Sequence, residues 1–334
     1  MINTSKGRIA LILIVFLTMM TAISQPVSAS TSYIVSRSDK KYSYTDMKKD
    51  IEALTAKHPD RLTSQVLGES ADGRNIYALC LGNPEAEKQI FVTAGMHARE
   101  YINCQVVMMM VERYCRNYGG KYKGKTYRQL FDEVAVYIIP MVNPDGIAIS
   151  QSGAGAIRNA ALRKKVQKMP RRGGYSNWKS NARGVDLNHN YKMYAGKHPQ
   201  KKPASENYPG PSRFSESETK AVHDLMKSMT NMKACLNYHS MGQVIYWGYK
   251  NKSYKSKSYA LAKMFRQMTG YYLIDESYTK ATYGDLEHYV INEYRIPYVC
   301  IETGYGGVPV SSRQLLPIYK KVMDSFEKTA YMYR

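Results

Sequence analysis

Two residues that could bind a metal ion, His97 and Glu100, follow an apolar run in the segment FVTAGMHARE at 91–100. The run suits a buried strand, and Gly95 allows a backbone turn that a Cβ would resist. Both residues would then lie where a strand ends, which is where open α/β sheets bind ligands. Imidazole nitrogens and carboxylates are zinc ligands, and a catalytic zinc takes three protein ligands. Two ordinary surface residues can have the same spacing, so this segment alone does not establish a metal site.

Two other apolar segments end in residues that would complete a metal site. His239 follows the apolar segment 234–238, and Glu302 follows the apolar segment 298–301. A carboxylate at the end of a buried strand is costly unless it has a partner. Each residue alone could be structural, so the pattern predicts a site only if the strands converge.

The elements that must position these residues alternate between strand and helix. The patterns predict strands over 63–67, 75–81, 89–94, 134–140, 234–238, 244–249 and 298–301. They predict helices over 43–58, 101–118, 215–229, 257–269, 285–294 and 313–331. The methionine cluster of 101–118 is predicted to be core packing, and the basic stretch from 147 to about Pro211 a long functional loop. The alternation indicates one α/β domain with a largely parallel or mixed sheet.

The first 29 residues have the pattern of a secretory signal peptide. Lys6 and Arg8 precede an apolar core, and the small residues ending at Ala29 predict cleavage there. A retained membrane anchor is the alternative, but the apolar run is short for a bilayer span. We therefore expect a signal peptide at 1–29, a polar lead-in at 30–41, and one domain at 42–334. The mature protein is expected to be a secreted monomer, extracellular or associated with the cell wall, without a transmembrane segment.

The charge of the chain favours anionic surroundings. The formal net charge is +21, and loss of Lys6 and Arg8 with the signal peptide leaves +19. For an exported protein, such a charge favours acidic cell-wall polymers or anionic lipid head groups, although it is also compatible with a merely solvated surface. The sequence contains no nucleic-acid-binding motif, so nucleic acid is not an expected partner. The five scattered cysteines are predicted to be buried thiols and not a disulfide framework.

Five motifs, taken together, resemble the zinc carboxypeptidase family of carboxypeptidase A-like enzymes. They are HARE at 97–100, NPDG at 143–146, GVDLN at 184–188, NYHS at 237–240 and IETG at 301–304, within a resemblance that runs from about Tyr42 to Tyr331. The resemblance implies a single α/β domain with a twisted, mixed, mostly parallel eight-stranded sheet flanked by helices. It also implies one Zn²⁺ per chain, bound by His97, Glu100 and His239, with Glu302 as the general base.

Two departures from the family pattern concern the substrate. Lys179 stands where the family has an electrophilic arginine, and Arg183, Arg163 or Arg158 could take that role instead. Asn188 is followed by His189 and not by the arginine with which digestive members bind a C-terminal carboxylate, so bidentate capture is weakened. This combination is similar to the bacterial branch that cleaves γ-D-glutamyl-diamino acid bonds in peptidoglycan stem peptides.

The remaining substrate contacts are carried over by position. Tyr278 matches the family's capping tyrosine, with Tyr283 as a rival. Glu287 lies near the base of the specificity pocket, where a carboxylate suits an amine-bearing substrate; the alternative is an exposed helix glutamate. Arg99 resembles an arginine that contacts the substrate backbone, or it is only a surface charge.

Three hypotheses follow for the function. The first is a secreted zinc metallopeptidase acting on peptidoglycan stem peptides, with zinc-activated water and Glu302 as base. The second is a conventional metallocarboxypeptidase that releases basic C-terminal residues. The third, a non-catalytic cell-wall or peptide-binding module, conflicts with the presence of all three ligands and Glu302.

Overall fold

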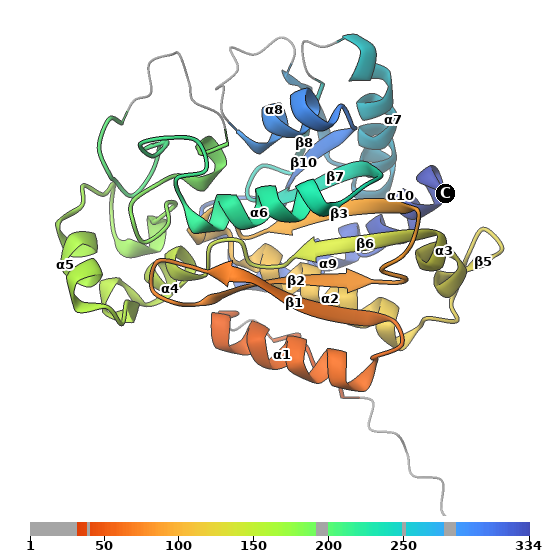
Figure 1. Ribbon diagram of the computed structural model, residues 1–334, viewed down its shortest axis with the longest axis horizontal. Helices are drawn as coiled ribbons and strands as arrows, with labels where there is room; N and C mark the ends of the chain where they lie inside the picture. The colour runs from red at the N-terminus through yellow and green to blue at the C-terminus, as the bar shows by residue number, and fades with distance from the viewer. Residues whose placement is uncertain (1–31, 39–40, 192–199, 249–251, 277–284) are drawn as a thin grey trace, which may run out of the picture. The chain divides into compact units, whose positions relative to one another are not determined.

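The strands that carry the predicted ligands are neighbours in one eight-stranded sheet. The computed structural model describes residues 32–38, 41–191, 200–248, 252–276 and 285–334. The sheet order is β1-β2-β6-β3-β7-β10-β8-β9 (Figure 1). Four of the seven neighbouring pairs are parallel and three are antiparallel. The predicted mixed, mostly parallel eight-stranded sheet is therefore confirmed.

The strands are β1 (Leu62–Glu69), β2 (Asn75–Leu81), β3 (Lys88–Ala94), β6 (Val134–Ile139), β7 (Met232–His239), β8 (Val244–Trp247), β9 (Tyr272–Asp275) and β10 (Tyr298–Glu302), with a separate small hairpin of β4 (Lys121–Tyr122) and β5 (Lys125–Thr126). The α-helices are α1 (Tyr44–Lys57), α2 (Ile102–Arg116), α3 (Tyr127–Glu133), α4 (Pro144–Ser152), α5 (Ala160–Lys168), α6 (Ser217–Ser228), α7 (Lys252–Thr269), α8 (Leu286–Tyr289), α9 (Leu315–Val322) and α10 (Ser325–Tyr333).

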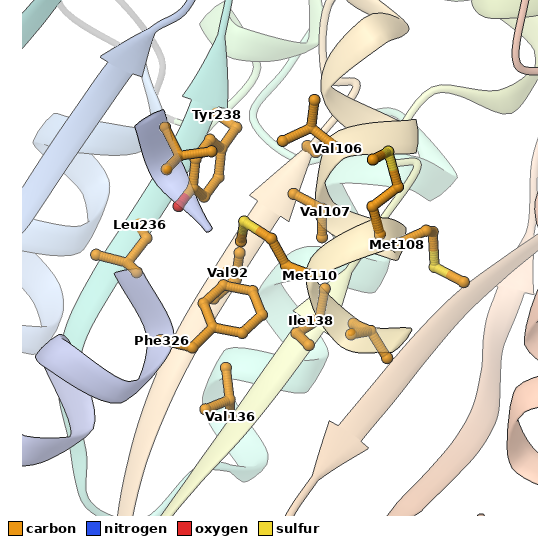
Figure 2. Close-up of a cluster of buried hydrophobic side chains, with 14 of the residues drawn as sticks. Val92, Val106, Val107, Met108, Met110, Val136, Ile138, Leu236, Tyr238 and Phe326 are labelled. Carbon is orange, nitrogen blue, oxygen red and sulfur yellow. The ribbon is translucent and has the colours of Figure 1, made fainter. Parts of the chain in front are cut away.

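Helices cover both faces of the sheet, so its central strands are apolar on both sides. In β3, Ile90, Val92 and Ala94 face the core shared with α1, α2, α9 and α10, whereas Phe91 faces the core shared with α6 and α8. Figure 2 shows the first of these cores, where valines and methionines of α2 meet Val92, Leu236 and Phe326. The three methionines 108–110 are fully buried, which confirms the predicted core packing. This packing fixes the strands whose ends carry the site.

The stretch predicted as one long loop contains two helices, and that prediction is wrong in part. Asn143 accepts the Gly146 N–H and caps α4, so the NPDG motif at 143–146 is the start of a helix. Asn159 caps α5 in the same way through the Leu162 N–H. The other described residues of the stretch include short 3₁₀ turns at 154–156, 175–177 and 187–189.

The predicted closing helix is two helices, α9 and α10, which are separated at Met323 and Asp324. The Met323 carbonyl accepts hydrogen bonds from Tyr114 (2.7 Å) and Arg113 (3.1 Å) of α2. Because the Met323 carbonyl accepts these side-chain hydrogen bonds, it does not accept the backbone hydrogen bond that would continue the helix. This explains why the helix breaks here although the sequence has no glycine or proline at this point.

The described lead-in residues pack on the domain. The backbone N–H groups of Ile34 and Val35 donate to the Glu112 carboxylate of α2 at 2.8 and 3.1 Å, and Val35 is fully buried. Residues 33–334 accordingly form one compact unit. The predicted signal peptide, residues 1–29, lies outside the described residues. No helix in the described part of the chain is long and apolar enough to cross a membrane.

Candidate metal centre and active site

His97 and Glu100 are brought together by a tight turn after β3. Gly95 turns the chain with a φ of +67°, and a Cβ there would collide with the sulfur of Cys104. His97 then begins a single 3₁₀ turn that ends at Glu100. As a result, His97 Nδ1 lies 2.9 Å from Glu100 Oε1.

His239 joins this pair because β7 lies beside β3. The two strands are parallel, so their carboxyl ends share one edge of the sheet. His239 Nδ1 lies 2.9 Å from Glu100 Oε2 and 3.1 Å from His97 Nδ1. The three residues are 6%, 4% and 1% exposed for His97, Glu100 and His239, respectively. The structure thus brings together the three predicted ligands as one buried cluster that could hold a metal ion.

The donor atoms of this cluster fit zinc in type and in spacing. A direct hydrogen bond between the two Nδ1 atoms needs one imidazole to donate, whereas a cation lets both act as neutral ligands. Zinc bonds of about 2.0–2.2 Å in tetrahedral geometry separate neighbouring ligand atoms by about 3.3 Å. The observed separations of 2.9–3.1 Å are close to that value. Three protein donors also match the number found in catalytic zinc sites.

The electrostatics of the cluster favour a positive charge at its centre. Burial alone would raise the pKa of Glu100, but the adjacent imidazoles of His97 and His239 outweigh burial and hold this pKa far below its ordinary value. Burial and the charge of Lys179 act to lower the pKa of His97, yet Glu100 and Asp186 raise it. A cation bound here would satisfy the same carboxylate.

Asp186 supports the cluster from behind, and it was not among the predicted site residues. Its Oδ1 lies 3.3 Å from His97 Nε2, and its Oδ2 forms an ion pair with Lys179 Nζ at 2.8 Å. The two atoms do not meet the geometry of a hydrogen bond, but a carboxylate this close to one imidazole nitrogen favours a proton there, which leaves the other nitrogen as a ligand. Burial would raise the pKa of Asp186, but Lys179, His189 and His97 hold it well below its ordinary value. This aspartate is part of the GVDLN motif. A charged residue between the apolar residues Val185 and Leu187 was the feature of the sequence that could have identified it as a site residue.

Four residues were candidates for the cation beside the metal centre, and of these the structure places Lys179 there. Arg158 binds Asp72, and Arg163 donates to the Ile157 carbonyl at 3.1 Å. Arg183 is exposed and lines a separate groove. The side chain of Lys179, by contrast, is only 14% exposed and contacts the Asp186 carboxylate.

Glu302 lies on the strand next to His239. β10 is parallel to β7, and Glu302 is the register partner of His239. Burial, and then the charge of Glu100, raise the pKa of Glu302 to about 8, against the opposing effects of His239 and Lys179. Its Oε2 is buried without a hydrogen-bond partner among the described residues. A carboxyl with a pKa near neutrality can accept a proton and return it.

A buried hydrogen-bond network that the sequence did not predict holds the ends of β7 and β10. Asn103 of α2 donates to Ser240 Oγ at 2.9 Å and accepts from Thr303 at 2.7 Å, and the two hydroxyl oxygens lie 3.1 Å apart. The Ser240 N–H also donates to Glu100 Oε2 at 3.1 Å. These bonds link Ser240 and Thr303, which directly follow His239 and Glu302, to the Glu100 carboxylate.

The predicted substrate-binding residues are distributed around the centre. Asn188 and His189 form a short turn with Asp186, and His189 Nε2 is 3.9 Å from the Asp186 carboxylate. Arg99 is half-buried and donates to the Asn177 carbonyl at 3.1 Å, so it is not a simple surface charge. Tyr278 and its rival Tyr283 lie outside the described residues.

Glu287 is buried on α8, so the alternative of an exposed helix glutamate is wrong. Burial, and then the neighbouring Glu276, raise the pKa of Glu287 far above its ordinary value. A buried carboxyl of this kind would take its charge only beside a cation.

Comparisons with known proteins agree with this geometry. The family model described as zinc carboxypeptidase matches residues 47–323. The chain is 28% identical over 298 residues to gamma-D-glutamyl-L-diamino acid endopeptidase 1 of Lysinibacillus sphaericus, covering 87% of this chain and 72% of that protein. It is 31% identical over 202 residues to carboxypeptidase B of Rattus norvegicus, covering 60% of this chain and 45% of that protein.

The fold also matches solved structures. The structure of bovine thrombin-activatable fibrinolysis inhibitor, in complex with tick carboxypeptidase inhibitor, superposes with a TM-score of 0.69 at 20% identity, covering 90% of this chain and 98% of that chain. Because the family model spans most of the sequence, this chain belongs to the zinc carboxypeptidase family and is a zinc metallopeptidase.

Proposed function

We propose that this metallopeptidase hydrolyses the γ-D-glutamyl-diamino acid bond of peptidoglycan stem peptides. The observation that carries the proposal is the similarity, over 87% of the chain, to an endopeptidase named for that bond. His189 supports it, since an imidazole cannot bind a C-terminal carboxylate with the two-pronged geometry of arginine. Buried Glu287 supports it as well, because a diamino acid carries an amine that a carboxylate can pair with.

In this proposal His97, Glu100 and His239 hold the zinc. When bound, zinc acts as a Lewis acid that polarises the amide carbonyl and lowers the pKa of water. The charge of the Asp186 carboxylate, 3.3 Å from His97 Nε2, favours the tautomer with Nδ1 unprotonated toward the centre. The Ser240 N–H keeps the Glu100 carboxylate in place.

Glu302 and Lys179 handle the proton and the developing negative charge. Glu302 removes a proton from the attacking water and delivers it to the leaving amine nitrogen. Lys179 uses one N–H on Asp186, and its ammonium has two further donors for the oxyanion. A lysine acts there as a point charge without the planar fork of arginine.

The substrate contacts are assigned in the same proposal. Arg99, Asn188 and His189 bind the substrate near the centre, Tyr278 caps it, and Glu287 receives the amine of the diamino acid. The protein is exported with cleavage after Ala29, and it acts outside the cell or at the cell wall. The intact mass of the protein recovered from the culture medium tests the export, because retention of residues 1–29 would contradict it.

A conventional carboxypeptidase acting on basic C-terminal residues is the second candidate. The similarity to carboxypeptidase B and the acidic Glu287 favour it. The two are separated by mass spectrometry of digests of L-Ala-γ-D-Glu-diamino acid, its α-linked isomer, and a peptide ending in lysine. We expect cleavage of the γ-linked peptide alone. Release of lysine from the plain peptide, with the γ-linked peptide intact, would refute the cell-wall substrate.

A further inference from the structure

The positive charge of the chain is concentrated in one segment beside the active site. Between Gly146 and Ser205 the sequence has thirteen lysines and arginines and a single acidic residue, Asp186. Asp186 is buried and already paired with Lys179. In its described residues this segment therefore presents cations at the surface without carboxylates of its own.

Six of these cations define what we call the basic face: Lys164, Lys165, Lys168, Arg183, Lys201 and Lys202. All six are exposed. Within the described part of the chain, none of them forms an ion pair with a carboxylate. Exposed lysines and arginines on a solvated surface are usually interspersed with acids, so a face of one sign is an electrostatic footprint.

The basic face borders an open groove of about 510 Å³. Of the six cations, Lys165 of α5 and Arg183 line the groove, and the other four lie one or two positions in sequence from a lining residue. The apolar lining includes Leu162, Met169 and Pro203. The groove is joined to the catalytic loop, because the Ser205 N–H donates to the Pro170 carbonyl and the Lys179 N–H donates to the Ser205 carbonyl. A ligand in this groove would lie on the loop that carries Lys179.

We propose that this groove binds a linear polyol-phosphate polymer, in which phosphodiester groups alternate with short uncharged units. Several exposed cations in and beside the groove suit repeating charges better than a single small anion, because each contact releases a counterion. Arginine and lysine bind phosphate strongly, and the apolar lining suits the carbon chain between phosphates. The inference concerns polymer binding and is independent of the bond that the active site cleaves.

The surroundings of the groove favour such a polymer over nucleic acid. Proteins that bind single strands stack the bases on exposed aromatic rings. Tyr175, which lies in this segment, is instead covered by the Arg171 guanidinium at 4.5 Å from the ring centroid. The groove therefore offers charge and apolar contact, and no open stacking platform in the described residues.

The test compares two triple charge reversals in the purified protein. One combines Lys165→Glu, Lys168→Glu and Lys202→Glu on the basic face. The matched control combines Lys123→Glu, Lys263→Glu and Arg334→Glu, which line a separate open groove. Binding to poly(glycerol phosphate) is measured from about 50 to 200 mM salt. Circular dichroism and the melting temperature verify that both variants fold.

We expect at least about tenfold weaker binding for the basic-face variant and less than about twofold change for the control, with a shallower salt dependence only for the former. Equal losses in both variants, or no loss in the first, would overturn the proposal. Equally tight binding of poly-glutamate by the wild type would refute a preference for phosphodiester polymers, and equally tight binding of single-stranded DNA would refute the preference for a polyol-phosphate chain over nucleic acid. Hydrolysis of a small stem peptide should be unchanged in both variants, and its absence from the wild type would bear only on the proposed substrate.

Discussion

Replacing Asp186 by asparagine tests how the buried carboxylate supports the metal centre. The substitution keeps the size of the side chain but removes the charge beside His97 Nε2 and Lys179 Nζ. An asparagine can also present its NH₂ group to His97, which favours the tautomer with a protonated Nδ1. Mutating a residue that supports a metal-binding histidine lowers metal affinity or activity by about 10- to 100-fold, which corresponds to about 1.4–2.7 kcal/mol. We expect zinc affinity to fall within that range.

The assay is competition for zinc with a chelator of known affinity, followed in parallel with thermal unfolding of the metal-free protein. Asp145→Asn is the matched control, since Asp145 is also fully buried and accepts from Ser70, the Asp72 N–H and Arg74. That variant should lose folding stability and keep its zinc affinity. If Asp186→Asn bound zinc as tightly as the wild type, or if both variants lost affinity equally, the supporting role of Asp186 would be wrong.

Two further predictions address the general base and the pH dependence of stability. Glu302→Gln should lower kcat by about 10²- to 10⁴-fold while zinc content, measured by elemental analysis, is unchanged; normal turnover would exclude Glu302 as the base. Glu218 is fully buried, and burial, then Asp145 and Glu216, raise its pKa from 4.5 to about 8. Because this folded-state pKa is raised, its stabilising contribution is complete below about pH 4.5 and is lost as the pH rises through 8, by up to about 5 kcal/mol. Urea unfolding should show that Glu218→Gln gains stability relative to the wild type at pH 9 but not at pH 4; a gain independent of pH would contradict this pKa.

The convergence of the ligands could be predicted because it depends on a simple rule of sheet geometry. His97, His239 and Glu302 each follow a short apolar strand, and parallel neighbours expose their carboxyl ends at one edge. The residue patterns predicted the strands, and the resemblance to the zinc carboxypeptidase family implied that the residues at their ends share one site. Neither source gave the contact distances, since these depend on the turn at Gly95 and on the network around Asn103.

Other features could not be predicted because tertiary contacts decide them. The end of α9 is set by the Tyr114 and Arg113 side chains that bind the Met323 carbonyl, and these residues are more than two hundred positions away in sequence. Helix α5 has only Leu162 and Val166 as an apolar pair, so its periodicity is weak. Its Asn159 cap and its basic last turn were nevertheless readable signals.

The stretch from Gly146 to Ser205 combines two kinds of electrostatics that respond differently to salt. The Lys179 and Asp186 pair is buried, so mobile ions screen it weakly, whereas the basic face is exposed and acts over a Debye length of about 8 Å at physiological ionic strength. Turnover of a small peptide should therefore depend little on salt, and retention of a polyanion should depend on it steeply. A segment that serves both purposes can change its polymer affinity through Lys165 or Lys202 without altering the charge that faces the metal centre.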